Sequence, residues 1–253
     1  NLISSTIFQI TKGKNESYWI DTEGGITHLE AERSTHYTAA NGLPDASVRE
    51  IALDASARVW AGSDGLFRLK GDQFMAISPK TLSHKQVRTI LHTGDGTYVG
   101  TTKGLHLIRG DEDVVIPDLP VELSQLSIID LFMDSQKTLW IGHYGGVHRL
   151  MNNQFERLTP QPGLDAVATY KIMEDREQNL WFATDRGVSK LVPSPFVSYT
   201  TAQGMSHPFV RAMALDDKKN IWMGTRDGIS FLDYANNRIY DLRKTYPLPN
   251  SRA

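Results

Sequence analysis

A short motif that occurs six times is the feature that most constrains this chain. The clearest copy is LWIGHYGGVHRL at residues 139–150, an aromatic and a branched residue, a glycine-containing turn and an apolar run ending in leucine. All five tryptophans and one tyrosine take the same place in the motif, at successive spacings of 41, 38, 42, 41 and 41 residues: Trp19, Trp60, Tyr98, Trp140, Trp181 and Trp222. The chain is therefore a tandem array with a period of about 41 residues.

Each repeat predicts four short strands joined by turns. In the second repeat the strand-like runs are SVREIALD, VWAGS, LFRLK and QFMAIS, and no segment of the chain shows a convincing helical period. One such small sheet cannot bury both faces alone, whereas sheets packed side by side can, with the tryptophan between them. We predict an all-β fold, a β-propeller of four-stranded antiparallel blades. A solenoid of stacked sheets is the alternative.

The repeat divides residues 1–253, taken as a single propeller domain, into six blades. They cover approximately 1–42, 43–82, 83–122, 123–164, 165–205 and 206–247. The chain begins and ends at the same point of a repeat, so we expect it to be excised from a longer array, either seven-bladed or tandem.

Two turn positions recur with the tryptophan. An aspartate stands six residues before it in four repeats, and we interpret it as a cap that accepts backbone amides across the first turn: Asp54, Asp134, Asp175 and Asp216. A glycine in the second turn is expected to supply the positive φ of a tight hairpin: Gly65, Gly104, Gly146, Gly187 and Gly228.

Composition excludes several classes of function. The chain has no cysteine and a net charge of −2, which excludes disulfides and thiolate metal sites and gives no case for a nucleic-acid partner. No run approaches the ~20 apolar residues of a membrane helix, and no phosphate loop, HExxH or GxSxG motif occurs. We predict no cofactor, no metal and no catalysis by this fragment.

The repeats resemble the two-component regulator propeller family. IMEDREQNLWFATDRGVSKL and MALDDKKNIWMGTRDGISFL match its pattern closely, as do FVSYTTAQGM and THYTAANGLP in the fourth strand and exit loop. The departures are local: Tyr98 replaces tryptophan, and Asp21 and Ala183 replace glycine. The resemblance implies the periplasmic sensing region of a membrane-anchored histidine kinase or diguanylate cyclase, with a small-molecule or glycan ligand; a homodimer stays open.

Ligands of propellers usually bind where the loops between second and third strands meet those between blades. These loops offer an aromatic face, a donor and planar charged groups, which suit a sugar: His143, Tyr144, Asp185, Arg186, Arg226 and Asp227. Exposed hairpin tips without any ligand are the alternative.

A second candidate set is basic. Arg49, Arg88 and Arg211 each follow the first apolar residue of a predicted innermost strand, where guanidinium groups would attract a carboxylate or sulfate or pair with nearby acids. His106 and His148 share a third-strand position, and we favour hydrogen-bonded strand histidines over a metal there.

We therefore expect a non-catalytic periplasmic sensor that binds a carbohydrate and passes its state on by rigid-body or dimer rearrangement. One alternative is a polysaccharide lyase or hydrolase, for which Tyr144 with His143 is the only candidate acid–base pair. Another alternative is a protein-interaction scaffold.

Overall fold

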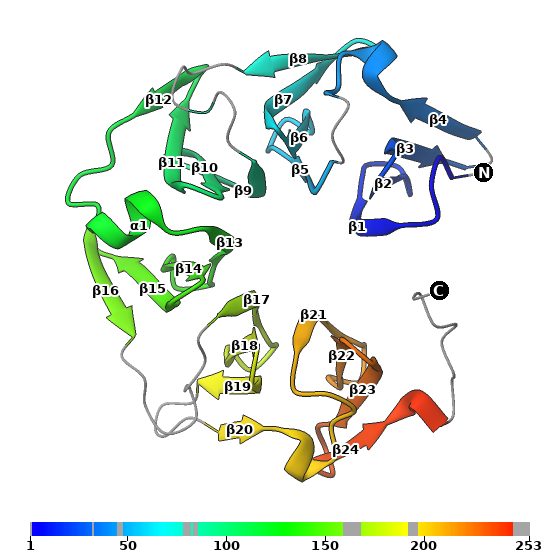
Figure 1. Cartoon of the computed structure of the whole chain (residues 1–253), viewed down its shortest axis with the longest axis vertical. Helices are drawn as coiled ribbons and strands as arrows, with labels where there is room; N and C mark the ends of the chain where they lie inside the picture. The colour runs from blue at the N-terminus through cyan, green and yellow to red at the C-terminus, as the bar shows by residue number, and fades with distance from the viewer. Residues whose placement is uncertain are drawn as a thin grey trace. The chain divides into compact units, whose positions relative to one another are not determined.

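The chain is a β-propeller of four-stranded antiparallel blades, as predicted. The computed structural model describes residues 2–31, 33–44, 48–77, 82, 86–158, 168–191 and 197–244, and these form six sheets (Figure 1). Each sheet falls inside one of the six predicted blade ranges. The chain divides into two compact units, Asn1–Leu131 and Phe132–Ala253, which are described separately.

The first unit contains three blades. Their strands are β1 (Ile7–Lys12), β2 (Tyr18–Thr22), β3 (Gly25–Glu30) and β4 (Arg33–Tyr37); β5 (Glu50–Leu53), β6 (Val59–Ser63), β7 (Gly65–Lys70) and β8 (Gln73–Ile77); and β9 (Val87–Thr93), β10 (Gly96–Thr101), β11 (Gly104–Arg109) and β12 (Glu112–Val114). β5 contacts both β1 and β9. The first strands are thus neighbours, and the fourth strands lie on the outer side of this unit (Figure 1).

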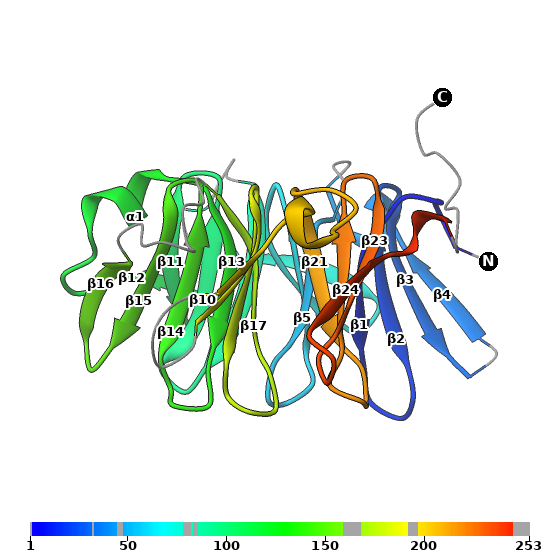
Figure 2. The ribbon, with the colours of Figure 1, turned by 90° about the horizontal axis from the view of Figure 1, so that it is seen from below.

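The second unit repeats this plan. Its blades comprise β13 (Ile128–Met133), which spans the boundary between the units, β14 (Leu139–His143), β15 (Gly146–Met151) and β16 (Gln154–Leu158); β17 (Thr169–Glu174), β18 (Leu180–Thr184), β19 (Gly187–Leu191) and β20 (Val197–Tyr199); and β21 (Val210–Leu215), β22 (Ile221–Thr225), β23 (Gly228–Asp233) and β24 (Arg238–Asp241). β17 contacts β14 and β21. Within each blade the strands run between two sets of loops (Figure 2).

The links between blades contain short helices that the sequence did not predict. These are η1 (Ala39–Asn41), α1 (Val121–Gln125), η2 (Thr201–Gln203) and η3 (Leu242–Lys244). Leu123 of α1 is fully buried. The helix packs closely on Gly104, where a Cβ atom would lie only 2.6 Å from the Ser124 carbonyl oxygen, so a larger residue does not fit there. Segments of three to five residues are too short to show a helical period. No described helix is long and apolar enough to cross a membrane.

The aspartate before each tryptophan caps the turn, as predicted, and also binds the indole. Asp134 accepts Gln136 N at 2.9 Å and Thr138 N at 2.8 Å through Oδ1, and Trp140 Nε1 at 2.8 Å through Oδ2. The same indole bond, which we name the Asp–Trp clip, occurs in four blades: Asp54–Trp60 at 3.0 Å, Asp134–Trp140 at 2.8 Å, Asp175–Trp181 at 2.8 Å and Asp216–Trp222 at 3.1 Å. One carboxylate thus fixes both a turn and the ring that fills the space between blades.

The clipped indole is covered by the next blade. Trp181 is 0% exposed and clusters with Val210 and Met223 of the following blade. Trp222 has the same clip but is 38% exposed. Comparing Trp181 with Trp222 therefore separates the stability that comes from the clip from the stability that comes from burying the indole under the next blade.

Removing the clip aspartate is expected to cost more beside Trp181 than beside Trp222. Asp175→Ala leaves the indole N–H and two turn amides without their acceptor in a buried setting, at a cost of roughly 2–4 kcal/mol in the free energy of unfolding. Asp216→Ala is expected to cost clearly less, because water reaches the Trp222 ring. Urea unfolding followed by circular dichroism measures both. Equal losses of unfolding free energy in the two variants would show that burial of the indole by the next blade does not strengthen the clip.

One buried carboxyl has no counterpart in the other blades. Asp21 stands where the other repeats have glycine or alanine; it is fully buried, and neither of its oxygens has a hydrogen-bond partner among the described residues. Desolvation raises the pKa of Asp21 to about 7. The amides of Asp21 and Gln9 oppose this shift without reaching hydrogen-bond geometry.

Asp21 is expected to make the protein less stable as pH rises. The folded state keeps a proton that the unfolded chain releases near its ordinary pKa of 3.8. Ionisation of Asp21 therefore has no cost below its ordinary pKa, and it lowers the free energy of unfolding by roughly 4 kcal/mol at pH 7. Asp21→Ala should raise the melting temperature more at pH 8 than at pH 4.5, and Asp21→Asn should also flatten the pH dependence. An unchanged pH slope in both variants would refute this origin.

Candidate functional site

The hairpin tip between second and third strands is fastened beside the residue that precedes the first strand, here called the lead-in residue. In the second unit Asp185 N donates to the Ala168 carbonyl at 3.3 Å, and Arg226 N donates to the Phe209 carbonyl at 3.0 Å. The first unit repeats the bond, for example from Thr102 N to the Gln86 carbonyl at 3.0 Å. The two predicted sets of loops therefore meet at one end of these blades.

Each of these hairpins is also closed internally. Thr184 Oγ1 donates to the Gly187 carbonyl at 2.8 Å and accepts Arg186 N at 3.1 Å, and Gly187 has a φ of 130°. The positive φ predicted for this turn is therefore confirmed at Gly187; residues with a side chain rarely adopt this conformation. The tip is therefore held in place before any ligand arrives, which lowers the ordering cost of binding.

Three aromatic rings lie in succession across the second unit. Tyr144 lies at the β14–β15 tip, Tyr170 is the second residue of β17, and Phe209 is the lead-in residue of β21. The ring centroids of Tyr144 and Tyr170 are 6.3 Å apart, and those of Tyr170 and Phe209 are 4.8 Å apart. The guanidinium carbon of Arg211 lies 5.2 Å from the centroid of the Phe209 ring. We name the three rings the aromatic strip.

Sequence reasoning found part of this arrangement. It selected Tyr144 and Arg211 separately, and it singled out neither Tyr170 nor Phe209 as a candidate. An aromatic residue directly before the apolar start of a first strand, as in FVR at 209–211, is the signal that could have found it. The structure brings these residues of three blades into one row.

The charged tip residues have different surroundings. Arg186, Arg226 and Asp227 are exposed, while Asp185 is half-buried and its Oδ1 accepts Ala168 N at 3.2 Å. The Asp241 carboxylate, and to a smaller degree Asp227, raises the pKa of Arg243. Asp185 and Asp227 thus interact with other groups of the protein, whereas Arg186 and Arg226 are exposed at the tips.

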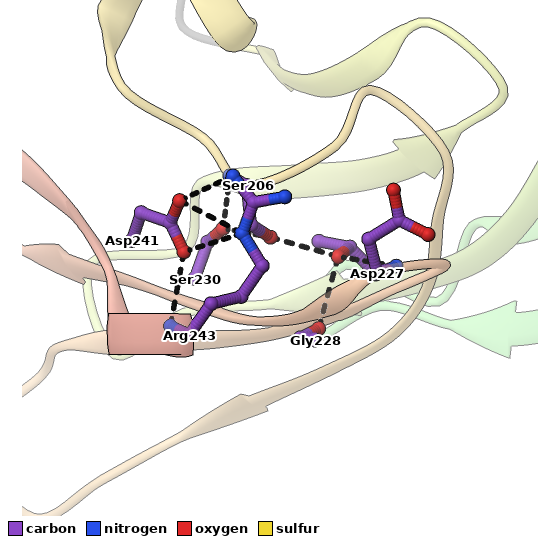
Figure 3. A network of polar contacts seen from close by, with 7 residues as sticks. Ser206, Asp227, Gly228, Ser230, Asp241 and Arg243 are labelled. Atoms are coloured by element: carbon purple, nitrogen blue, oxygen red, sulfur yellow. Dashed lines mark hydrogen bonds and ion pairs between the residues drawn. The ribbon is translucent and has the colours of Figure 1, made fainter. Parts of the chain in front are cut away.

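A polar network holds the Thr225–Gly228 hairpin (Figure 3). The Ser206 hydroxyl lies 2.8 Å from both Thr225 Oγ1 and Ser230 Oγ, and Arg243 binds Asp241 at 2.6 Å. The described hydrogen-bond partners of the Ser206 side chain are hydroxyl groups, so no base activates it as a nucleophile. The network positions the Thr225–Gly228 hairpin, where Thr225 Oγ1 donates to the Gly228 carbonyl at 2.9 Å.

His143 does not join the aromatic strip. Its side chain is fully buried, and its Nε2 lies 2.8 Å from Nδ1 of His148, which is 3% exposed. The neighbouring Tyr144 is 46% exposed. The expectation of a paired His143 and Tyr144 at the ligand face is therefore wrong, because the strand ends at His143 and the tip begins at Tyr144.

The second arginine set divides between the two units. In the first unit the guanidinium carbon of Arg49 lies 5.3 Å from the centroid of Phe8, and Arg88 is half-buried. Arg211 belongs to the second unit. Each unit thus carries an aromatic–arginine contact at the start of a first strand.

The strand histidines have hydrogen-bond partners. His106 Nδ1 lies 2.9 Å from Asp113 Oδ2, and His148 contacts His143. Among the described residues, no group of three or more potential ligands is arranged to hold a metal ion.

Comparison with known proteins shows the fold. No protein-family model and no curated protein sequence matches the chain. Among solved structures, the chain is similar to the extracellular domain assigned to the hybrid two-component system BT3049 of B. thetaiotaomicron, with a TM-score of 0.82 and 23% identity over 98% of this chain. The extracellular domain assigned to the one-component system BT4673 of that organism matches 91% of the chain, with a TM-score of 0.65 and 18% identity.

A propeller enzyme is also similar. A virginiamycin B lyase from Staphylococcus aureus, in an inactive form with quinupristin, has a TM-score of 0.70 and 16% identity over 94% of this chain and 85% of its own. The chain spans only 36% and 38% of the two B. thetaiotaomicron chains. These likenesses support the resemblance to the two-component regulator propellers at the level of the fold.

Proposed function

We propose that this chain is the ligand-sensing propeller of a membrane-anchored signalling protein, located outside the cytoplasm, and that it binds a carbohydrate without transforming it. The aromatic strip carries the proposal. Similarity to extracellular domains of two-component systems supports the cellular setting, and a histidine kinase or diguanylate cyclase is the proposed output.

The strip has the chemistry that a sugar requires. Its three rings offer apolar faces for stacking, and Arg211 offers a planar donor beside Phe209. Arg226 is exposed on the tip whose main chain is bonded to Phe209. The tips are anchored through main-chain bonds, so the site is largely formed before binding. Such stiff blades transmit the bound state by rigid-body movement or dimer rearrangement rather than by refolding.

Soluble glycan fragments are expected to stabilise the protein. A ligand at 100 times its Kd adds about 2.7 kcal/mol to the free energy of unfolding, so a thermal-shift screen should show a clear rise in melting temperature. Tyr170→Ala, which removes the central ring, should abolish that rise, whereas His143→Thr should keep it because His143 is buried away from the strip. If Tyr170→Ala kept the ligand-induced rise in melting temperature, the aromatic strip would not be the binding site.

Lyase chemistry is the second candidate, favoured by the likeness to the virginiamycin B lyase. The described histidine beside the strip is His207, whose Nδ1 accepts the Phe209 amide at 3.0 Å. That bond occupies the lone pair that a general base would use.

Chromatographic analysis of each glycan mixture should therefore show unchanged substrate. His207→Ala should leave binding within about threefold of the parent, since a change below ~0.7 kcal/mol is expected for a group outside the contact. Cleavage products that disappear in His207→Ala would establish the lyase instead.

A further inference from the structure

Phe209 contacts one arginine through its ring and a second through its main chain. Arg211 reaches it from β21, with its guanidinium carbon 5.2 Å from the ring centroid, and Arg226 is fastened beside it by the bond from its amide to the Phe209 carbonyl at 3.0 Å. Both side chains are exposed. The two arginines belong to one blade, Arg211 to β21 and Arg226 to the β22–β23 tip that is bonded to the main chain of Phe209.

The acids nearby do not neutralise these two arginines. Asp185 uses Oδ1 to accept the Ala168 amide. Asp227 interacts electrostatically with Arg243. Neither Arg211 nor Arg226 forms an ion pair with any residue that the structure describes. Both exposed guanidinium groups are therefore outside the ion pairs of the described residues.

The charge lies where a stacked sugar would present its substituents. Tyr170 and Phe209 are 4.8 Å apart and tilted by 40°, so a ring stacked on either one lies close to the arginines. A guanidinium binds carboxylate and sulfate groups through paired planar hydrogen bonds, which neutral hydroxyls do not match in strength. Arg211 beside this apolar face, with the exposed Arg226 on the adjoining tip, favours an acidic sugar over a neutral one.

We infer that the ligand of the aromatic strip is an acidic carbohydrate, and that Arg211 and Arg226 bind its carboxylate or sulfate beside Phe209. The inference rests on the proposed function and narrows its ligand class. It adds a specificity role for two residues, while Tyr144 and Tyr170 supply the stacking that acidic and neutral sugars share.

Two matched pairs of probes test this by isothermal titration. Oligogalacturonate is compared with its methyl ester, which has the same sugar chain without charge, and a sulfated galactan (carrageenan) hexasaccharide, which carries no carboxylate, is compared with its neutral desulfated form. The charged member of at least one pair should bind ten times or more tighter than its partner and weaken as salt rises. The pair that shows this distinguishes carboxylate from sulfate recognition.

Variants separate charge recognition from stacking. Arg211→Gln and Arg226→Gln should each weaken the charged probe about tenfold and leave the neutral probe unchanged, because a charged hydrogen-bonded contact is lost. Tyr170→Ala should weaken both members of a pair. Arg238→Gln is the matched control, since Arg238 lies 5.3 Å from the Tyr240 ring on the outer strand of the same blade, and it should bind like the parent.

Two results would overturn the inference. Neutral probes that bind as tightly as their charged partners, or arginine variants that keep full affinity for the charged probe, would sink the acidic ligand and leave the carbohydrate sensor standing. Failure of every probe, charged and neutral, would instead refute the proposed function, and the inference with it.

Discussion

The Asp–Trp clip is the interaction on which the blades depend. A tryptophan between two sheets buries much apolar area, but its N–H is costly inside a core unless it finds an acceptor. The aspartate of the preceding turn provides that acceptor, and its other oxygen holds the turn amides. A single carboxylate therefore links the local turn, the direction of the ring and the spacing of neighbouring blades. This combination explains why the two residues keep a separation of six.

Where the clip is missing, other contacts orient the aromatic ring. In the first blade the clip position is Gly13, and Trp19 stacks on His28 with ring centroids 3.9 Å apart. In the third blade Tyr98 replaces the tryptophan and stays buried, and His92 takes the aspartate's place and bonds Thr97 at 2.9 Å. The repeat tolerates these exchanges because the ring position itself is set by strand register. Turn chemistry is therefore more variable than the core.

Much of the fold could be predicted because repeats multiply a weak signal. Single strands of three to seven residues are ambiguous, but six copies in register define strands, turns and the positive φ of Gly187. The short helices η1 and η2 also recur, with Thr38 and Thr200 as their N-caps, but three residues are too few to show a helical period. The clip itself was only half predicted, because sequence spacing indicated a cap but not that Oδ2 would face the indole.

The candidate site was harder to predict than its scaffold. Tyr144, Tyr170 and Phe209 belong to three different positions of the repeat, so alignment of the repeats separates them, and only the packing of neighbouring blades brings them together. That His143 is buried while Tyr144 is exposed was also not predictable from the sequence. Adjacent residues at the end of a strand point into different environments, and a sequence does not show where the strand ends to within one residue.

Main-chain bonds join the tips at Thr102, Asp185 and Arg226 to their lead-in residues. Such a bond is indifferent to the side chain that each residue carries. Arg186 and Arg226 can therefore be exchanged for other residues without loosening the blade that presents them. In evolution, related arrays could change what they recognise by single substitutions at these tips while the clipped core stays constant. The fold separates the residues that must be kept from those that are open to selection.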